Sequence, residues 1–291
     1  MTAFTVIGGP SSEDLGKKIA SKLKSKFIGC ELRVFPDGES KITLKDKPKG
    51  TTIVVQSIHP PVDSNLVRSL AILAQARSCS SQVYAVIPYM GYARQDRQFL
   101  PGEIITMEII AKLFKAAGAT KIIVVDIHST IALKHLKIPA KNVSAVEELA
   151  KYFKKLPLNN PLVVSPDKGG IERARNFADL LGIDFIALEK HRDRKSGNVA
   201  IETKGLDGVK GRDMIIVDDM ISTGGSIVKA AGFLKKQKSG KIYACCTHAL
   251  LIGDAEQNIL KAGVTKIIST NTIPGKTSVV DVSSIIVKAL V

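Results

Sequence analysis

Two adjacent carboxylates and a short loop of hydroxyl-bearing residues and glycines carry the most specific chemistry in this sequence. Asp218 and Asp219 directly follow residues 214–217, an apolar and mostly β-branched run with the character of a buried parallel strand. Ligands of open α/β sheets bind at the carboxyl ends of strands, where these carboxylates are expected to lie. The residues that follow include Ser222, Thr223, Gly224, Gly225 and Ser226.

The composition of this loop suits a phosphate group. Its two glycines allow a tight turn in which successive backbone N–H groups point inward, and its hydroxyls add further donors. The helix expected from residue 227 adds positive potential at its N-terminus. The sequence therefore predicts a sugar-phosphate site in which the loop holds phosphate and the carboxylates hold ribose hydroxyls, directly or through Mg²⁺.

The loop differs from two other phosphate-binding patterns. It does not end in the Gly-Lys-Ser/Thr of a Walker A motif, and it lacks the Gly-x-Gly-x-x-Gly spacing of a dinucleotide site. It resembles the phosphoribosyl-pyrophosphate loop shared by phosphoribosyltransferases and ribose-phosphate pyrophosphokinases. The alternative is an ordinary strand–turn–helix junction with acidic capping residues, although two adjacent acids and T-G-G-S exceed what capping requires.

Composition indicates a basic α/β protein of two domains. A chain of 291 residues with 45% hydrophobic residues can bury two cores. The net charge of +15 would suit nucleic acid, but the lysines are scattered, and an aromatic content of 5% argues against a base-stacking surface. We therefore expect polyphosphate substrates and no nucleic-acid partner.

A cytoplasmic location without membrane association is expected. The sequence has no run of about 18 apolar residues, and residues 1–12 have the pattern of a first strand and turn rather than of a signal peptide. Its cysteines have no metal-ligand spacing, as is typical of reduced intracellular thiols. These cysteines are Cys30, Cys79, Cys245 and Cys246.

Strand and helix patterns alternate along the whole chain, which predicts parallel sheets covered by helices. The expected strands are residues 4–7, 53–56, 83–88, 121–126, 162–165, 185–188, 214–217, 242–247 and 266–270, with two further short strands on either side of a turn at residues 33–39. The expected helices are residues 12–24, 64–77, 103–117, 146–154, 170–181, 227–238 and 281–290.

The two halves share a common order of segments. IVV, VYAVIPY and AGATKII in the first half recur as IIV, IYACCTH and AGVTKII in the second, which indicates a duplication, with chance similarity of strands as the alternative. The first-half counterpart of the phosphate loop is SIHPPVDS, residues 57–64. Its prolines remove N–H donors, so only the second half is expected to cradle the sugar phosphate.

Five stretches together resemble the ribose-phosphate pyrophosphokinase family over essentially the whole chain: FPDGE, PYMGYARQDR, VVDIHS, VVSPDKGG and EKHRDRKSGNV. The resemblance implies that the first two hold ATP, with FPDGE reaching across a subunit interface. The implied ATP contacts are Phe35, Asp37, Gly38, Glu39, Arg94, Gln95, Asp96 and Arg97. A guanidinium suits polyphosphate because it donates paired hydrogen bonds and stays charged.

The other stretches imply a metal and a catalytic loop. His128 and Asp167 resemble the family's Mg²⁺ contacts. Lys190 and Arg192 match its Lys-x-Arg catalytic pair, with Arg192 also at ribose 5-phosphate. The charged loop that carries the pair is expected to be mobile without ligand. The departures from the family pattern are Ser222, where many relatives carry an acid, and Lys168.

The resemblance implies two duplicated phosphoribosyltransferase-like domains, each a mainly parallel sheet flanked by helices. Residues 1–143 would bind ATP and form the oligomer, and residues 144–280 would bind ribose 5-phosphate, with a C-terminal helix in 281–291 returning to the first domain. The implied reaction converts ATP and ribose 5-phosphate to AMP and 5-phosphoribosyl 1-pyrophosphate in a homo-oligomer, at least a dimer. The alternatives are a phosphoribosyltransferase and a non-catalytic regulatory homologue.

Overall fold

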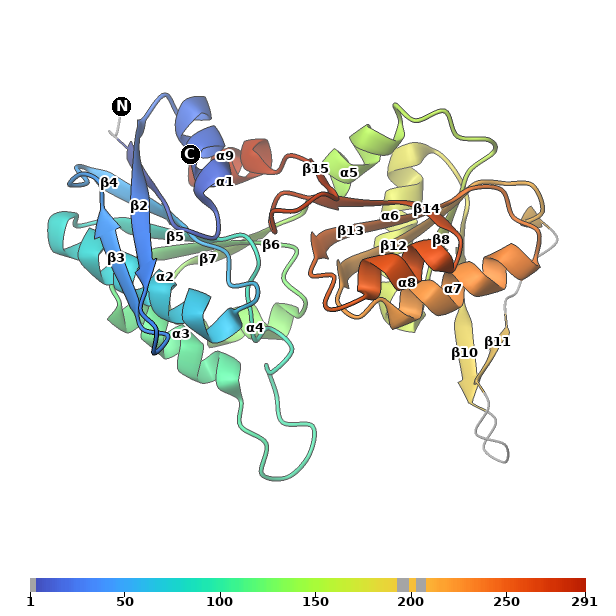
Figure 1. The fold of residues 1–291 in the computed structure, drawn as a ribbon, viewed down its shortest axis with the longest axis horizontal. Coiled ribbons are helices and arrows are strands. Elements are labelled where there is room, and N and C mark those ends of the chain that lie inside the picture. Colours follow the sequence, from blue (N-terminus) through green and yellow to red (C-terminus); the bar gives the residue numbers. More distant parts are fainter. Residues whose placement is uncertain (1–3, 193–198, 203–207) are drawn as a thin grey trace. The chain divides into compact units, whose positions relative to one another are not determined.

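The chain divides into two units, and each is built around one sheet (Figure 1). The computed structural model describes residues 4–192, 199–202 and 208–291, and the side chains of 189–192 and 199–202 lie outside this description. Unit 1 contains Met1–Ser144, Asn271–Pro274 and Asp281–Val291; unit 2 contains Ala145–Thr270 and Gly275–Val280.

Unit 1 has a seven-stranded sheet of order β3-β2-β1-β4-β5-β6-β7, in which only β2 and β3 pair antiparallel. Its strands are β1 Phe4–Gly8, β2 Lys26–Val34, β3 Ser40–Leu44, β4 Thr51–Val55, β5 Val83–Ile87, β6 Lys121–Val125 and β7 Ala140–Val143. Its helices are α1 Glu13–Lys22, α2 Val62–Cys79, α3 Thr106–Ala116, α4 Thr130–His135 and α9 Ser283–Leu290. In Figure 1, α1 and α9 lie over one face of the sheet, and α2 and α3 lie over the other.

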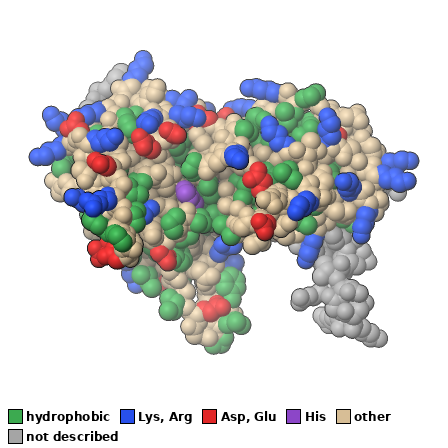
Figure 2. Space-filling view, viewed as in Figure 1, with side chains coloured by type: hydrophobic (Ala, Val, Ile, Leu, Met, Phe, Trp, Pro, Cys, Tyr) green, Lys and Arg blue, Asp and Glu red, His purple; other side chains and the backbone are tan. Residues whose placement is uncertain are grey.

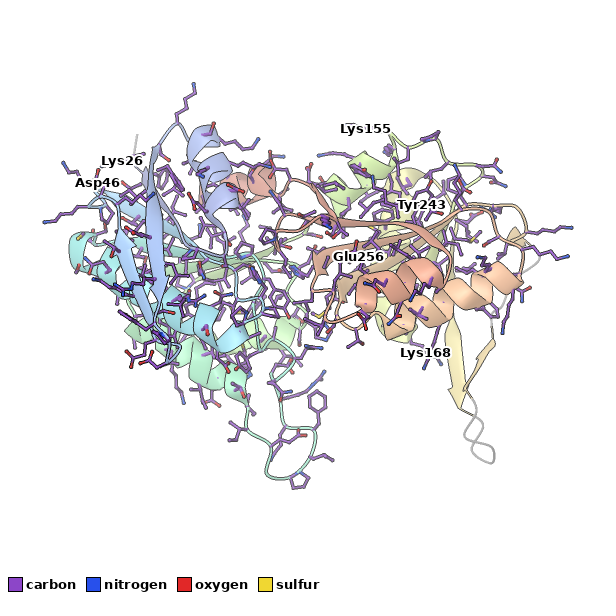
Figure 3. All side chains as sticks on the ribbon, viewed as in Figure 1. Lys26, Asp46, Lys155, Lys168, Tyr243 and Glu256 are labelled. Atoms are coloured by element: carbon purple, nitrogen blue, oxygen red, sulfur yellow. The ribbon has the colours of Figure 1, made fainter. Side chains whose placement is uncertain are left out.

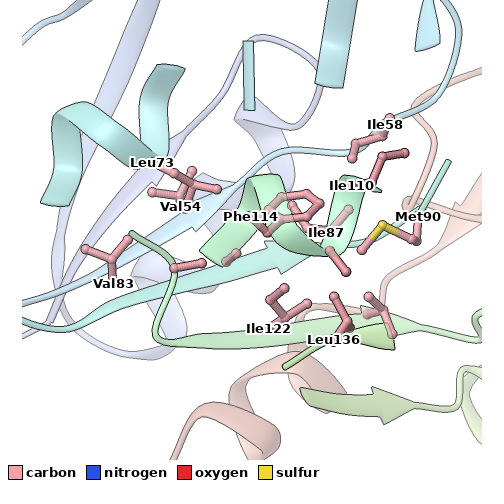
Figure 4. Packing of buried hydrophobic residues seen from close by; sticks show 14 of the residues in the cluster. Val54, Ile58, Leu73, Val83, Ile87, Met90, Ile110, Phe114, Ile122 and Leu136 are labelled. Atoms are coloured by element: carbon pink, nitrogen blue, oxygen red, sulfur yellow. The ribbon is translucent and has the colours of Figure 1, made fainter. Parts of the chain in front are cut away.

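The core of unit 1 lies between the sheet and the helices α2 and α3 (Figure 4). Phe114 of α3 packs among Val54, Leu73, Ile87 and Ile122, all at most 1% exposed. Burying one such side chain contributes on the order of 1.5–3 kcal/mol. This packing holds the carboxyl ends of β5 and β6 in place; the candidate ATP residues 94–97 follow β5, and the candidate metal ligand His128 follows β6.

Unit 2 has a six-stranded, fully parallel sheet of order β15-β14-β13-β12-β8-β9. Its strands are β8 Leu162–Ser165, β9 Phe185–Ala187, β12 Met214–Ile221, β13 Ile242–Ala249, β14 Val264–Thr270 and β15 Ser278–Val280. Its helices are α5 Val146–Phe153, α6 Ile171–Leu181, α7 Gly225–Lys236 and α8 Ala255–Lys261, with one 3₁₀ turn, η1 Lys168–Gly170. Separately, β10 Glu189–Arg192 pairs antiparallel with β11 Val199–Glu202.

The two sheets confirm the common plan expected from the repeated segments. The order β2-β1-β4-β5-β6-β7 in unit 1 corresponds strand for strand to β9-β8-β12-β13-β14-β15 in unit 2. The matched pairs β4/β12, β5/β13 and β6/β14 are the segments that recur in the sequence. The two halves therefore place the ends of equivalent strands in equivalent positions, although their loops differ.

Several elements were not expected from the sequence. These are α4, α8, β7, β10, β11 and β15. The edge strand β7 is mostly exposed and has no apolar alternation, so backbone pairing with β6 defines it. Residues 189–192 form a strand rather than the start of a loop, and the mobility expected for the charged stretch falls on residues 193–198, outside the described residues.

The surface carries many basic side chains, in agreement with the positive net charge of the sequence. Lys and Arg side chains are spread over the face shown in Figure 2 rather than gathered in one patch. Over the parts of the chain that the structure describes, none of the helices is both long enough and apolar enough to cross a membrane.

Candidate active site

The acidic pair lies inside β12 rather than just beyond it, because the strand continues to Ile221. The side chains of Asp218 and Asp219 are 22% and 6% exposed. The Asp219 backbone N–H donates to Asp218 Oδ1 at 2.8 Å, and Arg173 Nη1 lies 3.4 Å from Asp218 Oδ1 and 3.5 Å from Asp219 Oδ1. Two carboxylates and one guanidinium therefore form a single cluster at the carboxyl end of the sheet.

Burial and neighbouring charges change the pKa of Asp218 in this cluster. Burial, followed by a hydrogen bond to Asp219 and its negative charge, raises the pKa of Asp218 to about 7, while the charge of Arg173 acts in the opposite direction. A carboxyl group with this pKa changes charge near neutral pH. Perturbed carboxylates of this kind are typical of functional sites.

The phosphate loop is shaped by glycine and supported from α8. Gly224 has φ +77°, and a Cβ at this position would lie 2.7 Å from Ile259 Cδ1, so a side chain here would be both strained and crowded. The N–H of Ile252 donates to the Ser222 carbonyl at 3.1 Å, which fixes the start of the loop. The loop leads directly into α7, whose first N–H groups have no partner within the helix. An anion is therefore favoured at this turn.

Asp167 shapes a second turn at the end of β8. Its Oδ1 accepts hydrogen bonds from the N–H groups of Gly169 at 3.0 Å and Gly170 at 3.2 Å, and its carbonyl accepts one from the Ser165 hydroxyl at 2.7 Å. A Cβ at Gly170 would lie 2.8 Å from Ser165 Oγ. The neighbouring Lys168 is exposed (Figure 3). Asp167 is partly exposed, and its carboxylate fixes the turn.

In unit 1, the residues of the loop after β5 differ in how exposed they are. Arg94, Gln95 and Arg97 are exposed, whereas Asp96 is 2% exposed. Asp96 accepts a short hydrogen bond from the Ser129 hydroxyl, its carbonyl lies 2.7 Å from the His135 ring, and Arg97 Nε lies 3.7 Å from its Oδ1. The structure therefore places Asp96 as a link between this loop and the segment that follows β6, not on the surface with its neighbours.

The FPDGE turn joins β2 and β3. The Phe35 N–H donates to the Glu39 carbonyl at 2.8 Å, Asp37 Oδ1 accepts from the Glu39 N–H at 3.1 Å, and Gly38 has φ +95°. Phe35 is half-buried, because the Arg33 guanidinium lies 4.9 Å from its ring centroid. A neighbour within its own hairpin therefore partly covers Phe35.

The expected site residues fall into the two units. Unit 1 carries the ATP residues and the exposed His128, which follows β6; unit 2 carries Asp167, the acidic pair and the phosphate loop. Lys190 and Arg192 lie on β10, and their side chains are outside the described residues. Among the residues that the structure does describe, no group of three or more His, Cys, Asp or Glu side chains is arranged around a metal position.

The first-half counterpart of the phosphate loop uses its N–H groups internally. The Ser57 N–H donates to Ser12 Oγ at 2.9 Å, and the Ile58 N–H donates to the Tyr89 carbonyl at 2.9 Å. Pro60 and Pro61 follow and carry no N–H. This geometry supports the expectation that the first half holds no phosphate at this turn.

The pKa of Asp218 predicts a pH-dependent gain in stability for Asp218→Asn. The pKa is about 7 in the folded chain against an ordinary value of 3.8, so from roughly pH 4 to pH 7 the folded state retains a proton that the unfolded state has lost. Wild-type stability therefore falls as pH rises through this window. The variant lacks this titration, and it should be more stable at pH 8 by on the order of 1–2 kcal/mol, with a smaller gain at pH 5.

Thermal unfolding of the ligand-free protein at both pH values measures this difference. The matched control is Asp184→Asn, which removes an exposed carboxylate of the same unit and should leave the midpoint almost unchanged. An equal midpoint difference between Asp218→Asn and wild type at pH 5 and pH 8 would contradict the prediction.

Both units match known proteins. Residues 4–118 match the model of the N-terminal domain of ribose phosphate pyrophosphokinase, and residues 133–282 match the phosphoribosyl transferase domain. The chain is 40% identical to the ribose-phosphate pyrophosphokinase of Methanopyrus kandleri over 95% of this chain and 94% of that protein. It is 37% identical to that of Methanothermobacter thermautotrophicus over 97% and 98% of the two chains. The crystal structure of phosphoribosylpyrophosphate synthetase from Mycobacterium smegmatis aligns with TM-score 0.86 and 26% identity, covering 99% of this chain and 97% of that one.

Proposed function

Because this chain belongs to the ribose-phosphate pyrophosphokinase family, we propose that it transfers the β,γ-diphosphoryl group of ATP to the C1 hydroxyl of ribose 5-phosphate. The products are AMP and 5-phosphoribosyl 1-pyrophosphate, a precursor for nucleotide biosynthesis. The observation that carries the proposal is the joint match of both units, since a phosphoribosyltransferase loop alone would account only for unit 2. The intact Lys190 and Arg192 pair and the complete phosphate loop also count against a non-catalytic homologue.

Ribose 5-phosphate binds to unit 2 in this proposal. The loop residues Ser222, Thr223, Gly224, Gly225 and Ser226 hold the 5-phosphate at the start of α7. Asp218 and Asp219, inside β12, accept hydrogen bonds from the ribose hydroxyls. Holding the sugar at both ends directs its C1 hydroxyl, and such positioning is a large part of catalysis of phosphoryl transfer.

ATP binds through the exposed residues of unit 1. Arg94, Gln95 and Arg97 contact the nucleotide. The buried Asp96 anchors their loop by accepting a hydrogen bond from Ser129. The FPDGE residues Phe35, Asp37, Gly38 and Glu39 contact the adenine and ribose in a neighbouring subunit. We therefore propose a homodimer at least. Sedimentation of an active enzyme as a monomer at assay concentration would contradict that assembly.

Mg²⁺ fits this arrangement as an ion carried with the nucleotide. Mg²⁺ binds through one or two protein ligands plus substrate phosphates and water, which agrees with isolated ligands rather than a dedicated cluster. The resemblance assigns two separate contacts: the exposed His128, which follows β6, would hold Mg²⁺ on the ATP phosphates, and Asp167, whose turn is fixed by Gly169 and Gly170, would hold a second ion near the ribose. Mg²⁺ bound at these residues would neutralise charge on the phosphates.

Lys190 and Arg192 complete the proposed mechanism, with Arg192 also contacting ribose 5-phosphate. The C1 hydroxyl attacks the β-phosphorus in line and AMP leaves. The two cations stabilise the charge that develops on the transferred group and exclude water. We place the enzyme in the cytoplasm, where its two substrates are available, and cell fractionation checks this location.

The activity is tested by following AMP release from ATP. Release should require ribose 5-phosphate and Mg²⁺, and 5-phosphoribosyl 1-pyrophosphate should form in equal amount. Ribose without its phosphate is the matched control substrate; it should support little release because the loop at 222–226 is left without its anion. AMP formation that is independent of ribose 5-phosphate would contradict the proposal, and base-dependent consumption of 5-phosphoribosyl 1-pyrophosphate would favour a phosphoribosyltransferase.

A further inference from the structure

Arg173 is a cation that has no role in the function argued so far, yet its guanidinium faces both carboxylates of the site. Its Nη1 atom lies 3.4 Å from Asp218 Oδ1 and 3.5 Å from Asp219 Oδ1. The Arg173 side chain is 26% exposed, so the guanidinium is largely withdrawn from water. One guanidinium thus bridges two acids that are adjacent in sequence.

The position of Arg173 is set by the fold around it. It stands in the first turn of α6, and the next residues, Ala174, Phe177 and Ala178, anchor that helix in the core of unit 2. A Cβ at Gly170 would lie only 3.9 Å from Arg173 Nη1. The guanidinium therefore lies between the Asp167–Gly170 turn and the acidic pair, two parts of the site that come from different strands.

The acidic pair needs such a partner to act as one group. Successive side chains of a strand normally point to opposite faces, and two nearby carboxylates repel one another. A guanidinium is a rigid fork of donors that remains charged and can serve two acceptors at once. Within β12 it places one positive charge beside both carboxylates and gives them a common direction.

We propose that Arg173 is a positioning residue for ribose 5-phosphate, holding Asp218 and Asp219 in the orientation that accepts the ribose hydroxyls. The inference rests on the proposed function and adds to it a residue outside the matched motifs. It predicts a selective effect: the affinity for ribose 5-phosphate depends on Arg173, whereas the affinity for ATP does not. An ion pair that only stabilised unit 2 would change the thermal midpoint without this selectivity.

The experiment compares Arg173→Met, Arg173→Lys and Arg175→Met with wild type. Arg175 lies on the same helix, but its guanidinium stacks 5.4 Å from the centroid of the Phe185 ring, so it controls for loss of a helix arginine. Calorimetric titration with ribose 5-phosphate should show a Kd raised roughly 10- to 100-fold in Arg173→Met, the loss expected when a charged hydrogen-bond partner is removed. The KM for ATP should change by less than about twofold, and Arg173→Lys should recover part of the affinity because it restores the charge.

A double-mutant cycle identifies the route of the effect. If Arg173 acts through the acids, adding Asp219→Asn to Arg173→Met should weaken ribose 5-phosphate binding by less than the sum of the two single effects. Three outcomes would overturn the positioning role. They are a wild-type affinity for ribose 5-phosphate in Arg173→Met, additive losses of that affinity in the double mutant, and equal losses of affinity for ATP and ribose 5-phosphate. Wild type and Arg175→Met provide a separate check on the proposed function. If neither releases AMP in a ribose 5-phosphate-dependent reaction, the proposed function is wrong, and the inference fails with it.

Discussion

Lys190→Ala is expected to lower kcat by on the order of 100-fold or more while ribose 5-phosphate binding stays nearly unchanged. Lys190 lies on β10, in the strand pair β10–β11, and matches the first residue of the family's Lys-x-Arg pair. A cation that acts on charge developing during transfer stabilises the transition state more than the bound substrate. Removing it therefore affects turnover rather than affinity.

The measurement pairs steady-state AMP release with calorimetric titration of ribose 5-phosphate. Lys155→Ala is the matched control, because Lys155 is an exposed lysine of the same unit (Figure 3). This control should keep both wild-type turnover and wild-type affinity. Near-normal kcat in Lys190→Ala would remove Lys190 from the mechanism, and a loss of affinity as large as the loss of kcat would assign it to substrate binding.

Replacement of both acids, Asp218→Asn with Asp219→Asn, should weaken ribose 5-phosphate binding by on the order of 100-fold or more. Each amide keeps the shape of the side chain but removes the charge that strengthens hydrogen bonds from sugar hydroxyls. Arg94→Ala should instead weaken ATP binding by roughly 10- to 100-fold, because an exposed guanidinium in unit 1 no longer contacts the phosphates.

Calorimetric titration of both variants with each ligand separates the two sites. The double acid variant should bind ATP normally and Arg94→Ala should bind ribose 5-phosphate normally, so that each protein is the control for the other. If both variants lost affinity for the same ligand only, the assignment of ATP to unit 1 and the sugar phosphate to unit 2 would be wrong.

The sequence by itself determined the plan of the protein. Its alternating apolar segments predicted strands such as residues 162–165, which is the extent of β8, and the recurring segments predicted two sheets with equivalent strands. The loop at 222–226 stood out because its residue types match a local requirement, namely a glycine at φ +77° and donors at the start of a helix. Features that depend on near neighbours in the chain are readable in this way, because periodicity and turn chemistry are local.

Tertiary structure alone decided which charged residues face the ligand and which hold the site together. In the run Arg94–Arg97 the sequence cannot distinguish Asp96, whose 2% exposure and contact with Ser129 appear only after β5 and β6 pair. Arg173 is one of two arginines on an amphipathic helix, and its contact with the acidic pair depends on α6 packing beside β12 across 45 residues of chain. Such roles come from contacts between distant segments, which burial and packing establish and which no local pattern encodes.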